Sequence, residues 1–210
     1  MKLYSDIQLE KLPHFIDSEL ENILTKEGEW SDDENDHPTK WGIIQATANA
    51  CGYEGDLKDL SKHDAKRCWA IHSWYGPRYD LIYQVSPEVC KHVMDTSGPA
   101  GVSLANKHLQ RLLNVLNDPV GPNPGEFRYG PDLTADGLIG AKTAERLKAY
   151  LDHRGKEGES VFIVAINAMQ LSHYVLVAEK NSGKRDFSYG WWKNRVFNDL
   201  NQVFNAIQIT

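Results

Sequence analysis

Serine residues at helix-start positions recur along this chain and constrain its fold more than any other feature. Ser18 and Ser61 each stand three residues before an acid, and Ser86 directly precedes Pro87. A serine hydroxyl at such a position can accept a hydrogen bond from a free backbone N–H, and proline fits the first turn of a helix. Apolar residues at helical spacing follow each of these signals. The sequence therefore predicts a mainly α protein.

The helix boundaries follow from the glycines and prolines that end the apolar periodicity. The first predicted helix ends at about Lys26 or Glu27 because Gly28 comes next, and glycine is common just beyond a helix. Residues 119–135 are rich in Gly, Pro and Asp and predict a loop, whereas the apolar run 161–169 fits a helix or a strand. The predicted helices are 18–27, 61–76, 86–98, 104–116, 144–155 and 191–207.

The composition fits a soluble globular protein and argues against nucleic acid as a partner. Of the 210 residues, 41% are apolar and 25% are charged, which is ordinary for a globular chain. Residues 1–98 contain 10 Lys and Arg against 18 Asp and Glu (net −8), whereas residues 99–210 contain 13 against 11 (net +2). Neither part has the basic stripe of a nucleic-acid-binding protein. Gly98 and Pro99 interrupt the helical pattern, which predicts two domains, 1–98 and 99–210.

Signals for membrane insertion, export and metal binding are weak in this sequence. No uninterrupted apolar run reaches the roughly 18 residues of a membrane span, and the N-terminal residues lack the apolar core of a signal peptide. We therefore expect synthesis in the cytoplasm and no stable membrane insertion. Cys51, Cys68 and Cys90 lack the CxxC spacing of a metal site, which predicts buried reduced thiols. The histidines show no ligand spacing either, so we expect no metal.

Acidic residues crowd the segment 27–43, and Glu27 has the most informative position. It ends the first predicted helix, where the helix dipole disfavours a negative charge. Leu24, Trp30 and Trp41 predict apolar surroundings for its side chain. A carboxyl group in such surroundings can stay protonated and give its proton to a leaving oxygen. Glu27 is therefore a candidate general acid, and the alternative is a solvated glutamate at a helix end.

Asp36 and Thr39 are the candidate partners of Glu27. Breaking a sugar–sugar bond needs a second carboxylate that stays ionised, or that holds a water on the opposite side of the bond. Asp36 can polarise that water, and the Thr39 hydroxyl can help to hold it. The acids at positions 32–34 compete for the same role. The structural alternative is an aspartate in an Asx turn, followed by a threonine that caps the next segment.

The order of these residues resembles glycoside hydrolase family 108, the phage and bacterial N-acetylmuramidases with a helical peptidoglycan-binding module. The resemblance covers about residues 15–200. It begins with Glu27-Gly28, Trp30, Asp33, Asp36 and Thr39-Lys40-Trp41-Gly42-Ile43. It continues, in the family's order, with Trp74-Tyr75, Val85–Val89, Leu109–Leu112, Asp136-Gly137-x-x-Gly140-x-x-Thr143 and Gly190–Val196.

The resemblance implies both a fold and a reaction. The fold would be a lysozyme-like catalytic lobe at 1–98 and a small helical lobe at 99–210 that binds the cell wall. The reaction would be hydrolysis of the β-1,4 bond between N-acetylmuramic acid and N-acetylglucosamine in bacterial peptidoglycan. Glu27 would be the general acid, and Asp36, assisted by Thr39, would orient or activate the water. The resemblance implies no cofactor and favours inversion at the anomeric carbon.

Four aromatic residues are candidates for substrate binding. Trp30, Trp41, Trp74 and Tyr75 have flat, partly apolar rings that can stack on sugar faces. Aromatic residues at helical spacing also fill protein cores, so core packing is the alternative. The Asp136-Gly137-x-x-Gly140 motif has two interpretations as well, because it can bind the cell wall or form a turn that starts a helix.

The same resemblance implies a biological role. The protein would be a monomeric phage endolysin, made in the host cytoplasm and released by a holin to act in the periplasm or cell wall. A bacterial muramidase that assists protein secretion is the other family role. Two further functions remain open from the sequence: a wall-binding protein with little activity, and a lytic transglycosylase that uses Glu27 alone.

Overall fold

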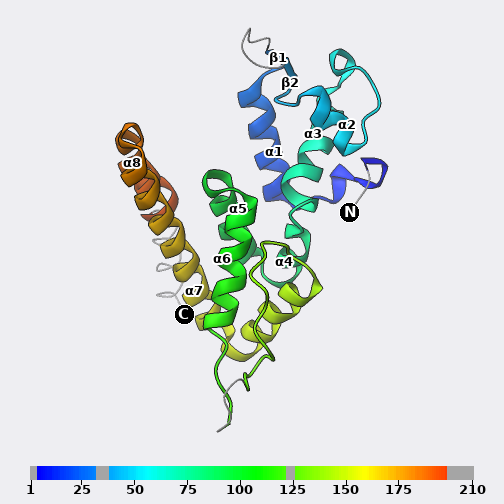
Figure 1. The fold of residues 1–210 in the computed structure, drawn as a ribbon. Helices are drawn as coiled ribbons and strands as arrows, with labels where there is room; N and C mark the ends of the chain where they lie inside the picture. Colours follow the sequence, from blue (N-terminus) through cyan, green and yellow to red (C-terminus); the bar gives the residue numbers. More distant parts are fainter. Residues whose placement is uncertain (1–3, 32–37, 122–125, 198–210) are drawn as a thin grey trace. The chain divides into compact units, whose positions relative to one another are not determined.

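Helices dominate the described part of the chain, as predicted. The computed structural model describes residues 4–31, 38–121 and 126–197 (Figure 1). The chain forms two compact units, Met1–Arg78 and Tyr79–Thr210, which we describe separately. This division comes earlier than residue 98. The predicted boundary between the two functional domains, 1–98 and 99–210, stays a prediction.

The first unit is a small helical domain with one short hairpin. Its strands pair antiparallel, with Trp30 opposite Lys40 and Ser31 opposite Thr39. Tyr4–Asp6, Leu9–Lys11 and Leu57–Asp59 form single 3₁₀ turns, and Ile71–Tyr75 is a π-helix. The main elements are α1 (His14–Glu27), β1 (Trp30–Ser31), β2 (Thr39–Lys40), α2 (Gln45–Cys51) and α3 (Lys62–Ala70).

Helix α1 ends where the sequence predicted, but it starts earlier. Its last residue is Glu27, and the Gly28 N–H donates to the Leu24 carbonyl at 3.2 Å, with a φ of 74° at Gly28. The helix begins at His14 rather than at Ser18. The buried apolar face extends further back than the serine signal, because Ile16 already packs in the core with 1% exposure. Packing of this face therefore decided the start.

Helix α3 confirms its predicted cap and is joined to α1 by ion pairs. The Ser61 hydroxyl accepts a hydrogen bond from the Asp64 N–H at 3.1 Å. Lys66 on α3 contacts Asp17 at 2.7 Å and Glu21 at 2.6 Å, both on α1. The Lys66 side chain is 12% exposed, so burial strengthens these contacts relative to pairs in open solvent.

These ion pairs predict stability that is lost in acid. Hydrogen bonds from Lys66 and Lys62 lower the pKa of Glu21 below its ordinary value. A carboxyl with a lowered folded-state pKa stabilises the fold above its unfolded pKa of about 4.3, and this contribution disappears as pH falls through the folded value. We expect Lys66→Met to lower the free energy of unfolding by about 1 kcal/mol at pH 7. Urea denaturation at pH 7 and pH 3 measures the difference.

A matched control separates this effect from general charge removal. Lys26 is an exposed lysine on α1, and Lys26→Met should leave the free energy of unfolding within about 0.5 kcal/mol of the parent. The Lys66→Met deficit should shrink at pH 3. A deficit of equal size at both pH values would show that Lys66 stabilises the fold by packing and not by its charge.

The second unit is built from helices that pack on one another, with a long loop between α6 and α7. Helix α5 contacts α4, α6 and α7, and α6 also contacts α7 (Figure 1). Ser182–Lys184 is a 3₁₀ turn and Trp192–Phe197 is a π-helix. The helices are α4 (Tyr79–Val85), α5 (Pro87–Ala100), α6 (Val102–Val115), α7 (Ala141–Lys180) and α8 (Arg185–Trp191).

The predicted signals at Ser86 and after residue 100 are confirmed with small shifts. The Ser86 hydroxyl accepts from the Val89 N–H at 3.0 Å, and Pro87 is the first helical residue. Helix α5 runs two residues past Gly98 to Ala100, and Gly101 caps it with a φ of 83°. The run 161–169, which periodicity left undecided, is helical within α7. Of the last predicted helix, 191–207, residues 198–207 lie outside the described part.

Helix α7 changes direction at Gly155. This residue has φ 60° and ψ −151°, a conformation that residues with a Cβ avoid. The Tyr150 hydroxyl donates to the Gly158 carbonyl at 2.9 Å and so connects the two halves. The predicted helix end at Gly155 is therefore a kink, and a second helical segment continues to Lys180.

The kink predicts a specific intolerance of side chains. We expect Gly155→Ala to lower the free energy of unfolding by about 1–3 kcal/mol, because alanine strains this conformation. Gly190 is the control, since an added Cβ there meets no atom within 4 Å and the residue lies inside α8. Gly190→Ala should be neutral or stabilising by up to about 1 kcal/mol. Equal destabilisation of both variants in thermal melts would contradict a special role for Gly155.

Part of α7 is apolar enough to be compared with a membrane span. One 18-residue window within Ala141–Lys180 has a mean hydropathy of 1.7, and 39% of that window is buried in the structure. A core helix of a soluble protein meets the same criterion of length and composition. Asn167 and Gln170 interrupt the apolar residues of this segment. The sequence therefore shows no uninterrupted apolar run of that length here. The absence of membrane insertion stays a prediction.

The cysteines occupy the interiors of the units. Cys51, Cys68 and Cys90 are buried and free, which confirms the prediction of reduced thiols. Burial raises the pKa of the Cys90 thiol, so this group stays protonated at neutral pH. None of the three is therefore an exposed nucleophile.

Candidate active site

Glu27 lies at the C-terminal end of α1 with its side chain exposed. The apolar surroundings predicted from the sequence are therefore not present. Leu24 is fully buried in the core, and Trp30 is itself 43% exposed on β1. Glu27 is the last residue of α1 and lies beyond Leu24, the last buried residue of this helix, so only Leu24 is covered. Glu27 is available to a ligand from solvent.

The chain makes a left-handed corner directly after β2. Trp41 has φ 55° and Gly42 has φ 74°. Lys40 and Ile43 close the corner by two backbone hydrogen bonds, of 2.9 Å and 3.0 Å. The Trp69 indole N–H donates to the Trp41 carbonyl at 3.0 Å and fixes the corner to α3. A non-glycine residue at positive φ costs energy, so these contacts must outweigh the strain at Trp41.

Gly42 brings this corner into contact with the Glu27 side chain. A Cβ added to Gly42 would lie 2.6 Å from Cγ of Glu27, and 3.0 Å from both its Cβ and its Cδ. Real Cβ atoms do not come this close to carbon. The glutamate therefore lies directly against the bare backbone of the corner, which limits the rotamers that it can adopt. Gly42 is a contact of Glu27 that the role assignments from sequence missed, although the Thr-Lys-Trp-Gly-Ile motif contains it.

Of the other two predicted catalytic residues, Thr39 lies among the described residues and Asp36 does not. Thr39 is half-buried in β2 and pairs with Ser31, at the end of the hairpin next to its loop. Asp36, like the competing acids at 32–34, falls on residues 32–37, outside the described residues. Inversion at the anomeric carbon, which depends on the separation between Glu27 and a second carboxylate, stays a prediction.

The four aromatic candidates separate into two groups. Trp30 is 43% exposed and Trp41 is half-buried, so both have ring surface that a sugar could reach. Trp74 and Tyr75 are only 2% and 7% exposed. This burial fits core packing, the alternative that the sequence left open for them, and their role as sugar platforms stays a prediction. In the core, Trp74 packs edge-on against Phe15 at 6.0 Å between ring centroids.

The second unit gives the Asp136-Gly137 motif a structural role. Asp136 Oδ1 accepts hydrogen bonds from the Leu138 N–H at 2.8 Å and from Gln110 Nε2 at 2.9 Å. Gly137 has φ 83°, and an added Cβ would lie 2.8 Å from the Ser103 carbonyl oxygen. These two residues form a turn that approaches α6 closely. This turn is the structural alternative that the sequence left open for them.

Among the residues that the structure describes, no cluster of three His, Cys, Asp or Glu side chains is arranged to hold a metal ion. The chemistry that the described site offers is that of an exposed carboxyl on a rigid support. Such a group can donate a proton to a leaving oxygen or accept one from water. Glycosidic bond cleavage uses this chemistry.

Known protein families and structures match both halves of the chain. Residues 20–101 match the family model described as Glycosyl hydrolase 108, and residues 104–196 match the one described as Predicted Peptidoglycan domain. These matches confirm the resemblance seen in the sequence, and they support a glycoside hydrolase that acts on peptidoglycan. Among curated proteins, none matches the chain significantly.

A solved structure is similar along nearly the whole length. The structure titled "Structure of Brucella abortus SagA" is 21% identical, with a TM-score of 0.50, over 91% of this chain and 94% of that one. At this identity the likeness concerns the fold alone.

Proposed function

We propose that this protein is an N-acetylmuramidase that hydrolyses the β-1,4 bond between N-acetylmuramic acid and N-acetylglucosamine in peptidoglycan. The observation that best supports the proposal is the placement of Glu27. This exposed carboxyl ends α1 and lies against the bare backbone at Gly42. Both residues fall inside the segment that matches the glycosyl hydrolase model.

The proposed mechanism assigns the proton transfer to Glu27. Its carboxyl protonates the glycosidic oxygen as the bond to the anomeric carbon breaks, and a water completes the hydrolysis. Asp36 would polarise that water and the Thr39 hydroxyl would help to hold it. Trp30 has an exposed ring close to Glu27 in sequence, and we propose that it stacks on a sugar of the bound glycan.

Mass analysis of the products tests the reaction directly. Purified peptidoglycan digested by the protein should release fragments that end in reducing N-acetylmuramic acid. Each cut adds one water across the broken glycosidic bond, and the fragment masses should show this addition. Fragments with anhydro-muramic ends would instead identify a lytic transglycosylase. Binding of peptidoglycan without any released fragment would identify a wall-binding protein, and either result would overturn the proposal.

A further inference from the structure

The corner at residues 40–43 is a two-residue hairpin loop whose shape depends on one peptide group. Trp41 and Gly42 both have positive φ, 55° and 74°, as a type I′ turn requires. Rotation of the peptide group between them would bring Gly42 to a negative φ, because this rotation is what separates a type I′ turn from a type II′ turn. The direction of the Trp41 carbonyl is therefore tied to the shape of the corner.

The residue types in this corner do not favour that shape by themselves. Asn-Gly and Asp-Gly are the preferred pairs for a type I′ turn, whereas Trp41 has a large side chain at the first position. A bulky residue at positive φ persists only where its surroundings impose the conformation. The indole N–H of Trp41 is buried and has no hydrogen-bond partner among the described residues, so it does not supply the anchor. Other residues must hold the corner.

Trp69 of α3 holds the carbonyl that decides this shape. Its indole Nε1 donates to the Trp41 carbonyl oxygen at 3.0 Å. Trp69 is half-buried, and its ring packs edge-on against His72 with 6.0 Å between the ring centroids, so the donor is itself held on α3. A rotated peptide group would turn the Trp41 carbonyl away from this donor and lose the hydrogen bond.

The helix that carries Trp69 is also attached to the helix that carries Glu27. Lys62 of α3 forms an ion pair with Glu21 of α1 at 2.9 Å, and its Nζ lies 5.9 Å from the centre of the Trp41 ring. The ion pairs of α3 described above join the same two helices. Helix α3 therefore holds both the helix that ends at Glu27 and the corner that meets the Glu27 side chain.

We propose that Trp69 is a positioning residue for Glu27, which holds the Trp41–Gly42 peptide so that Gly42 presents its bare backbone to the glutamate. The inference rests on the proposed function for the role of Glu27 in proton transfer. It adds that a hydrogen bond from α3 places the proton donor. An added Cβ at Gly42 would lie 2.6 Å from Cγ of Glu27, so rotation of this peptide changes atoms in direct contact with the glutamate. Trp69 acts through the corner and is not a reacting group.

Trp69→Phe tests the hydrogen bond, because phenylalanine keeps an aromatic ring and has no N–H. We expect kcat for peptidoglycan hydrolysis to fall at least about tenfold, since a displacement of about 1 Å in a catalytic group can cost about 10²-fold. The KM should change by less than about threefold, because the hydrogen bond serves the proton transfer and not the binding of the glycan. A folded Trp69→Phe protein with the parent kcat would overturn the proposal.

A double-mutant cycle shows whether the effect passes through Glu27. In a Glu27→Gln background no proton donor remains to be misplaced, so adding Trp69→Phe should lower the residual rate by less than about twofold. A residue that only stabilises the fold would cause the same loss in both backgrounds. An equal loss with and without the Glu27 carboxyl would therefore refute the positioning role.

A second cycle shows whether Trp69 acts by fixing the corner. Trp41→Asn gives the corner the Asn-Gly pair that a type I′ turn favours, so its shape no longer depends on a donor from α3. This substitution removes a candidate sugar-binding ring and should raise KM, so kcat is compared. In this background Trp69→Phe should lower kcat by less than about twofold. A loss as large as in the parent would mean that Trp69 acts by another route, against the proposal.

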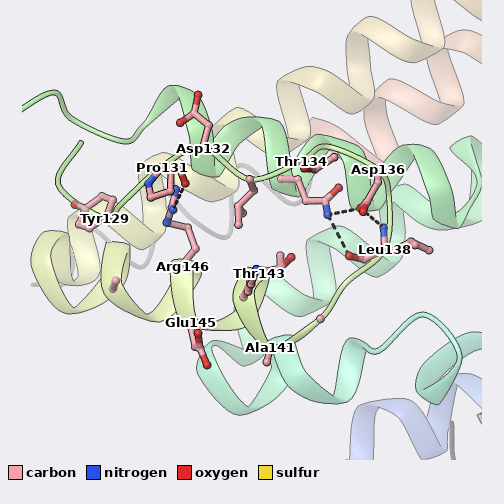
Figure 2. Close-up of a pocket in the computed structure, with 15 residues that line it drawn as sticks. Tyr129, Pro131, Asp132, Thr134, Asp136, Leu138, Ala141, Thr143, Glu145 and Arg146 are labelled. Carbon is pink, nitrogen blue, oxygen red and sulfur yellow. Dashed lines mark hydrogen bonds between the residues drawn. The ribbon is translucent and has the colours of Figure 1, made fainter. Parts of the chain in front are cut away.

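Two variants control for general loss of stability. Lys66→Met changes α3 three residues before Trp69. Asn114→Ala removes the side-chain donor that holds the Leu133 carbonyl at 2.8 Å, in the loop before α7 of the other unit (Figure 2). Both should lower the melting temperature and leave kcat within about twofold of the parent. If both lost kcat as Trp69→Phe does, the activity would follow stability and the inference would fail.

Hydrogen exchange separates this inference from the proposed hydrolase. The Ile43 N–H donates to the Lys40 carbonyl across the corner at 3.0 Å, and Trp69→Phe should accelerate its exchange at least about tenfold by local opening. Faster exchange in a protein that hydrolyses nothing would remove the muramidase and retain the role of Trp69 in the corner. Hydrolysis with a kcat that Trp69→Phe does not change would retain the muramidase and remove the inference, as would unchanged exchange at Ile43.

Discussion

A Glu27→Gln protein should lose about 10²–10⁴ of its rate of peptidoglycan hydrolysis, the usual contribution of a general acid. Glutamine has the same shape as glutamate but no proton to give to the leaving oxygen. Because Glu27 is exposed, the substitution should leave the stability of the fold unchanged. Initial rates of fragment release, measured with thermal melts of both proteins, test this expectation.

Glu29 is the matched control for this substitution. It is an exposed glutamate two residues further along the chain, so Glu29→Gln changes the same charge without removing the proposed proton donor. This variant should retain the parent rate within about threefold. A Glu27→Gln protein that clears peptidoglycan at the parent rate would refute the mechanism. An Asp36→Asn protein of unchanged rate would move the water-activating role to another acid, such as Asp32 or Asp33.

A Gly42→Ala protein should lose about 10²-fold in kcat, because a displacement of about 1 Å in a catalytic group can have that effect. The added Cβ would lie 2.6 Å from Cγ of Glu27 and force the carboxyl out of its position. The positive φ at Gly42 should also cost about 1–2 kcal/mol of stability. Steady-state kinetics and urea denaturation separate the two effects.

Gly101 provides the comparison for strain alone. It has φ 83° between α5 and α6, and an added Cβ there meets no atom within 4 Å. Gly101→Ala should therefore destabilise the fold by about the same 1–2 kcal/mol and leave kcat unchanged. If Gly42→Ala kept the parent kcat, the contact between Gly42 and Glu27 would have no part in positioning the carboxyl.

Local signals in the sequence predicted much of the secondary structure. The caps at Ser61 and Ser86 form as expected, because each serine satisfies a backbone N–H within three residues of itself. Gly28 ends α1 and Gly101 ends α5 for an equally local reason, their positive φ. Signals of this kind depend on neighbours in the chain and so can be seen without a structure.

Contacts between distant segments were harder to predict. Trp74 and Tyr75 appeared as candidate sugar platforms, yet packing against Phe15 places Trp74 in the core. Glu27 was expected among apolar residues and is exposed. The amide residues at 106, 110 and 114 form a regular pattern in α6, but only the returning loop shows what they bind. Period and composition do not specify which segment a helix face meets.

By itself, the sequence determined a mainly α chain, the helix end at Glu27 and the resemblance to a peptidoglycan hydrolase. Each of these depends on residues close together or on motifs in a fixed order. Only the tertiary structure brought Gly42 against Glu27, and only it buried Arg146 against the loop before α7, where its Nη2 donates to the Pro131 carbonyl. The physical reason is that steric contact and burial of charge depend on folding in three dimensions, and neither leaves a periodic signal along the chain.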